Sequence, residues 1–173
     1  MGSQSVLPFE RGSYWSDINA DSGLLGSEFE SANGKRYIIA EVASGSTLTG
    51  RRVVKWASKT ARTVQYITAA SDHPCGVTPD ELASVTVPSG AAVAVQIAGE
   101  AECMLGSGAV AITAGHFVGP NADSDGGKVA GLGGTPSLAD LLTTVGRAVD
   151  APAGVTDTVF TVDLYQGRLS IAD

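Results

Sequence analysis

The sequence predicts an all-β fold, mainly antiparallel, in the form of a compact β-barrel or β-sandwich with one or two short helices. First, apolar and polar residues alternate with a period of two in several runs of about five residues, as in half-buried strands. Second, glycine is frequent, at 22 of 173 residues, and glycine-containing turns separate these runs. Third, aromatic residues make up only 6% of the chain, which suits tight turns and small-residue packing.

The stretch from Pro88 to Pro120 shows this pattern most clearly. We expect strands at 93–98 and 100–105, separated by a break at Gly99, because the apolar residues alternate with small or polar ones on each side of it. A glycine turn at 106–108 precedes a third run at 109–113, and Phe117-Val118 begins the next strand.

Other strands are expected on both sides of this stretch, at 37–42, 52–56, 63–67, 84–87, 145–149 and 158–164. Residues 71–78, 121–128 and 131–134 are expected to be loops. Thr78 as N-cap and Pro79 as first residue predict one short helical turn through Leu82. In the same way, Thr135 and Pro136 predict a short helix ending near Thr144.

Residues 1–34 are predicted to be an extended or partly disordered N-terminal arm, and residues 35–173 a single β-rich domain. The arm is rich in Ser, Gly, Asn and acidic residues, and its apolar residues have no period. Adjacent aromatic residues commonly anchor interfaces, so Tyr14 and Trp15 favour an arm that becomes ordered against a partner.

Charge is unevenly distributed over a chain whose net charge is −7. Residues 35–62 contain seven basic residues and one acidic residue, whereas residues 63–173 contain three basic and twelve acidic ones. The basic segment is either a solvated strand pair or a docking patch for an acidic protein partner. The surrounding acidity opposes direct nucleic-acid binding. Our candidate contact residues in this segment are Arg51, Arg52, Lys55 and Trp56.

The sequence shows no constellation that predicts an enzyme, and we expect no catalytic, cofactor or metal site. His73 and His116 are the only histidines, and no nucleophile-elbow pattern occurs. Gly106–Ala111 fits a degenerate dinucleotide fingerprint but is expected to be followed by a strand instead of a helix. The acidic loop 121–128 lacks the twelfth-position glutamate of a calcium loop. Cys75 and Cys103 are expected to be free, buried thiols.

Several segments together resemble the tailed-phage capsid cement (head decoration) proteins. They are Pro74–Val77, Val95–Ala101, Gly108–Val118, Gly127–Val129, Val145–Ala151 and Thr158–Val162, so the resemblance covers roughly residues 40–165. His116 departs from the acidic residue that often follows the glycine in such proteins. The N-terminal 34 residues are also longer than the usual lead-in of the family.

The resemblance implies a viral structural protein that binds the outside of the expanded phage head and stabilises it against internal DNA pressure. The implied partners are the major capsid protein and further copies of the chain, as a homotrimer at three-fold positions. The protein would be made in the bacterial host cytoplasm and carried on the virion surface. No run approaches the roughly 20 apolar residues of a membrane helix, so no membrane partner is expected.

Three alternatives remain open. The first is another virion surface structural protein. The second is a lipoyl- or biotinyl-like carrier barrel, but the chain has no lysine between Lys59 and Lys128, and carriers present a lysine at a hairpin tip. The third is a small barrel-type hydrolase or lyase, which the missing polar cluster disfavours.

Overall fold

The computed structural model describes residues 23–107, 111–121, 126–154 and 157–165. In these residues, strands dominate, joined by one short α-helix and one 3-10 turn. The strands are β1 (Glu28–Glu30), β2 (Arg36–Val42), β3 (Val53–Ser58), β4 (Thr63–Tyr66), β5 (Gly76–Val77), β6 (Ala92–Met104), β7 (Phe117–Pro120), β8 (Val129–Gly133), β9 (Gly146–Ala148) and β10 (Val159–Leu164). All strand pairs are antiparallel except β2 with β4, so the predicted all-β, mainly antiparallel class is confirmed.

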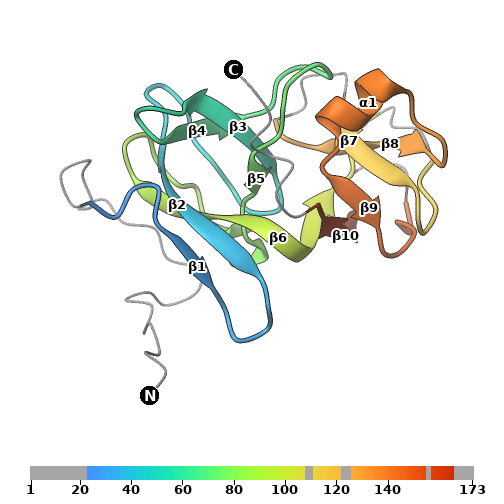
Figure 1. The fold of residues 1–173 in the computed structure, drawn as a ribbon, viewed down its shortest axis with the longest axis horizontal. Helices are drawn as coiled ribbons and strands as arrows, with labels where there is room; N and C mark the ends of the chain where they lie inside the picture. Colours follow the sequence, from blue (N-terminus) through green and yellow to red (C-terminus); the bar gives the residue numbers. More distant parts are fainter. Residues whose placement is uncertain (1–22, 108–110, 122–125, 155–156, 166–173) are drawn as a thin grey trace.

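Five strands close into a barrel at the left of Figure 1, in the order β2-β4-β3-β5-β6, with β6 pairing back onto β2. The barrel encloses a core of small aliphatic side chains, among them Val42, Val54, Val64, Val93 and Val95. β-branched residues suit strands because they pack well on a pleated surface. The strand β1 extends this sheet by pairing with β2, so residues 28–30 of the predicted arm are part of the sheet.

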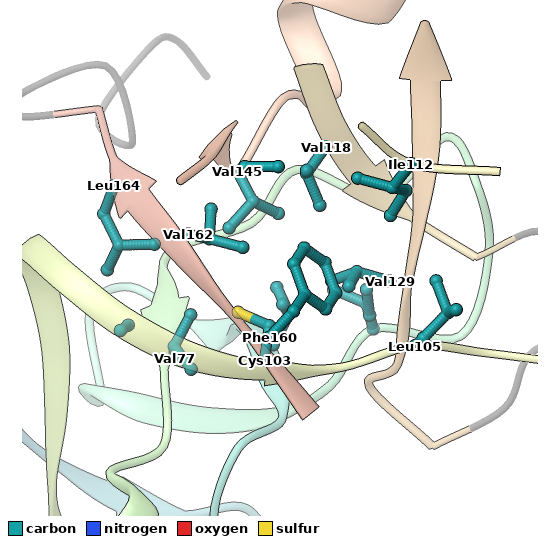
Figure 2. Close-up of a cluster of buried hydrophobic side chains, with 14 residues drawn as sticks. Val77, Cys103, Leu105, Ile112, Val118, Val129, Val145, Phe160, Val162 and Leu164 are labelled. Carbon is teal, nitrogen blue, oxygen red and sulfur yellow. The ribbon is translucent and has the colours of Figure 1, made fainter. Parts of the chain in front are cut away.

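A second sheet, at the right of Figure 1, has the order β6-β10-β9-β7-β8. A parallel bridge between Leu105 and Val129 links its two ends, which curls the sheet around its own core. Figure 2 shows Phe160 at the centre of this core, surrounded by aliphatic side chains from several strands. As the alternation predicted, Phe160, Val162 and Leu164 of β10 face inward and are buried.

The 13-residue strand β6 belongs to both sheets. Its first part pairs with β2 as far as Ala98, and its second part pairs with β10 from Gly99 onward. The predicted break at Gly99 is therefore wrong: the strand continues there and changes its partner. Gly99 has φ of +82°, a conformation that glycine adopts without steric cost.

The change of partner is held by a buried side chain, Gln96, which is only 2% exposed. Its Nε2 donates hydrogen bonds to the carbonyl oxygens of Ala98, at 3.2 Å, and Glu100, at 2.9 Å. Gln96 was expected on the polar side of an alternating strand. The side chain is buried instead, because a buried amide needs hydrogen-bond partners and the two carbonyl oxygens at the change of partner in β6 supply them.

Several expected strands differ in the structure. Residues 111–113 form no strand, and residues 108–110 lie outside the described chain. The expected strand 84–87 is reduced to a single bridge from Val87 to Leu48. Conversely, β8 extends through Gly133 into an expected glycine loop, and β5 lies within the expected loop 71–78.

Both predicted helical segments are present, but their caps differ from expectation. The 3-10 turn Asp80–Leu82 has no side-chain cap, because the Thr78 hydroxyl instead accepts a hydrogen bond from the Arg52 amide. The helix α1 (Leu138–Thr143) begins after Ser137, not Thr135. Ser137 and Asp140 form a reciprocal capping box, which satisfies two backbone N–H groups at the start of the helix.

Candidate partner-binding surfaces

The four contact residues predicted in the basic segment do not form one patch. Arg51 and Arg52 precede β3, and Lys55 and Trp56 lie within it. Successive residues of a strand point to opposite faces, so Trp56 shares a face with Val54 and packs against the barrel core, whereas Lys55 lies on the other face. Their role as partner contacts stays a prediction.

Arg51 contributes to the junction between the two halves of the molecule. Its Nε lies 2.7 Å from Oε2 of Glu102 on β6, without hydrogen-bond angles, so the contact is an ion pair and not a directed hydrogen bond. Its backbone also bridges the halves, because its amide donates to the Thr78 carbonyl and its carbonyl accepts from the Met104 amide. The residue has a positive φ of 63°. Replacing Arg51 would therefore disturb the fold as well as any partner contact.

Lys55 is also engaged within the chain. Its ammonium lies 2.9 Å from both carboxylate oxygens of Asp72. Burial by itself would raise the pKa of Asp72, but hydrogen bonds from the Thr68 amide, the Lys55 ammonium and the Ala69 amide outweigh it and hold this pKa below its usual range. The pair ties β3 to the loop before β5.

Other basic residues of the segment are more accessible. Lys59 and Arg62 are exposed at the turn between β3 and β4. A partner could reach them without disturbing the ion pairs of Arg51 and Lys55. The predicted arm contacts, Tyr14 and Trp15, lie outside the described residues.

The most exposed large apolar side chains among the described residues lie on α1, and no pattern in the sequence marks them as a contact site. Leu138 is 78% exposed and Leu142 is 55% exposed. Residues four apart in a helix lie on the same face, so the two form one outward-facing pair. The capping box fixes the start of the helix, and Nδ1 of His73 lies 3.2 Å from the carbonyl oxygen of Leu142 near its end.

A second group lies on the outer face of the second sheet. The Arg147 guanidinium carbon stands 4.2 Å from the centre of the Phe117 ring, and Nε of Arg147 donates to the Tyr165 hydroxyl at 2.7 Å. Phe117 and Tyr165 themselves meet edge to face, with ring centres 6.1 Å apart. Arginine and aromatic residues are enriched at protein interfaces. This arrangement offers a rigid, partly exposed contact site.

The residues that could carry chemistry are dispersed. In the described part of the chain, no three His, Cys, Asp or Glu side chains come together as metal ligands. Cys75 and Cys103 are free and buried, as predicted, and burial raises the pKa of both thiols, that of Cys103 to about 12. Among the helices of the described residues, none is long and apolar enough to cross a membrane.

Comparisons with known proteins add a structural likeness. No protein-family model matches the chain, and the search of curated proteins gave no match. Among solved structures, the chain is similar to the head fiber gp8.5 N base in bacteriophage phi29. The identity is 16% and the TM-score 0.47, over 79% of this chain and 99% of that chain. Likeness at this level carries no conclusion on fold or function.

Proposed function

We propose that this protein is a structural component of a tailed-phage virion, a cement protein that binds the outside of the expanded head. The observation that carries the proposal is the resemblance of residues 40–165 to the cement family. In the structure, most of the segments that carry the resemblance fall on or directly beside β5, β6, β7, β8, β9 and β10. Of these strands, β6 to β10 build the second sheet, and β5 pairs with β3 and β6 in the barrel, so the resemblance follows a connected structural unit and not scattered turns.

The surface features described above fit a protein that acts by binding other proteins. The leucine pair of α1 and the Arg147–Phe117–Tyr165 group are both preformed, the first by a capping box and the second by a cation–π contact and a hydrogen bond. Preformed contacts lose little conformational freedom on binding, which raises affinity. We propose that the basic segment 35–62 faces the shell. We also propose that the protein has no catalytic, cofactor or metal site.

The proposed mechanism is selective binding. A protein that binds only the expanded shell stabilises that state by mass action, by about 2.7 kcal/mol per site at a free concentration 100 times its Kd. When many copies bind one shell, the stabilisation of the expanded state is the sum of the contributions from all occupied sites. Self-association, proposed to be a homotrimer at three-fold positions, would further increase the apparent affinity because one bound subunit holds the others close to their sites.

The test is co-sedimentation of the purified protein with heads stripped of their own decoration, before and after expansion. We expect saturable binding to expanded heads only, at a fixed ratio to the major capsid protein. Binding to neither form, or equally to both, would reject the cement function.

The shell-facing side is tested in the same assay with the Lys59→Glu/Arg62→Glu variant, which leaves the ion pairs of Arg51 and Lys55 in place. The control is Thr86→Glu, which adds an acidic residue at an exposed position outside the basic segment. We expect weaker head binding from the double variant alone. Equal binding by both variants would reject the basic segment as the contact.

A further inference from the structure

The exposed leucine pair of α1 is an apolar surface that another group could cover. Leu138 and Leu142 present their side chains on one face of a helix whose start is fixed before any partner binds. The only charged side chain of α1, that of Asp140, is held in the capping box by the amide and hydroxyl of Ser137. The face is thus an apolar platform, suited to an apolar or aromatic group.

We propose that the Tyr14–Trp15 segment of a neighbouring copy of this chain covers the leucine pair of α1. This inference deepens the self-association included in the proposed function and rests on it. The segment Ser13-Tyr14-Trp15-Ser16 offers two adjacent aromatic side chains between small polar residues, which matches an uncharged apolar platform of two leucines.

The position of the arm favours a neighbouring copy over the same copy. The described chain starts at Gly23, shortly before β1, and Figure 1 shows β1 at the lower left and α1 at the upper right, in opposite halves of the molecule. The eight residue steps from Trp15 to Gly23 span at most about 29 Å. A compact domain of this length has a radius of gyration of about 16 Å, and hence a diameter of about 40 Å. The segment is therefore too short to cross the full diameter to its own α1, which favours the α1 of an adjacent copy.

Cysteine cross-linking tests the contact and its partner. Ser16→Cys places a thiol beside Trp15, and Ala139→Cys places one at an exposed position of α1. The native thiols of Cys75 and Cys103 are buried, so the introduced thiols react first. The two single variants are mixed in the full chain under mild oxidation, without any heads present. The control mixture replaces Ala139→Cys with Thr86→Cys, an exposed position on the barrel half.

We expect the disulfide-linked heterodimer to form at least ten times faster with Ala139→Cys than with Thr86→Cys. Adding Leu138→Ser and Leu142→Ser to the Ala139→Cys chain should remove this preference. The matched change Val149→Thr, at a side chain 45% exposed elsewhere on the second half, should leave it intact. Because the replaced side chains are exposed, the variants should keep the circular dichroism spectrum of the parent.

Two results would overturn the proposal. One is equal cross-linking at positions 139 and 86, or cross-linking that the leucine changes do not affect. The other is a Ser16→Cys/Ala139→Cys chain that closes an internal disulfide independently of dilution, which would place the arm on its own α1. Since no shell is present, these outcomes are separate from success or failure of head binding.

Discussion

Replacing Gln96 with leucine tests whether one side chain holds the junction between the two sheets. Leucine has a similar volume and suits a buried position, but it cannot donate to the carbonyl oxygens of Ala98 and Glu100. Leaving one buried acceptor without its partner costs about 1–3 kcal/mol. Two lost bonds therefore cost about 2–6 kcal/mol, and burying a more apolar side chain returns about 1–2 kcal/mol. With the middle of each range, we expect a net loss of about 2–3 kcal/mol in the free energy of unfolding.

Urea denaturation measures this loss as a lower midpoint with an unchanged m-value. In a domain of this size, a loss of 3 kcal/mol corresponds to a decrease of about 6–12 °C in Tm. The matched control is Gln65→Leu on β4, where the side chain is only half-buried, and we expect a change within about 0.5 kcal/mol. If the two variants lose the same stability, the hydrogen bonds of Gln96 do not hold the junction.

Three further predictions concern local features of the fold. Gly99→Ala should lower the free energy of unfolding by about 1–2 kcal/mol, because φ at this position is +82°; Gly134→Ala, in an open and unstrained position, should be near neutral in the same urea titration. Asp72 contributes stability above the pKa of about 4 that it has in the unfolded chain, and this contribution should be lost as pH falls through its lower folded pKa. Unfolding titrations from pH 6 to pH 3 should therefore show a weaker pH dependence in Asp72→Asn, and an unchanged dependence would contradict the assignment. Asp163 stands directly opposite Glu100 across β10 and β6, and both are exposed. Asp163 also faces Arg147 on β9, so the change that removes the repulsion alone is Glu100→Gln, which should raise stability by about 0.2–1 kcal/mol. The gain should shrink in high salt, and a gain independent of salt would argue against charge repulsion.

The sequence predicted the strands that have one buried and one exposed face. In β10, the alternation of Phe160, Val162 and Leu164 with polar residues gave both the element and its inward face correctly. The alternation could not predict very short strands or a strand that belongs to two sheets. The strand β5 has only two residues, and its pairing depends on β3 and β6, which are distant in sequence. Gly99 was misread because a local pattern does not distinguish the end of a strand from a change of its partner.

The candidate surfaces were less predictable than the fold. The basic segment could be recognised from its residue composition. The ion-pair partners of Arg51 and Lys55 could not, because they lie 51 and 17 residues away along the chain and only the fold brings them together. The helix α1 was expected from its proline and its cap. Whether Leu138 and Leu142 would face the core or the solvent depends on how the helix sits on its neighbours, which the periodicity of so short a helix does not determine.

The continuity of β6 has a mechanical consequence. A load applied between the two halves of the molecule acts along a single backbone strand that is hydrogen-bonded sideways to β2 in one half and to β10 in the other. Pulling the halves apart along this strand must shear many of those bonds together, whereas a flexible linker would simply extend. The strand is therefore a stiff connection between the halves, and tension applied to one half is transmitted directly to the other.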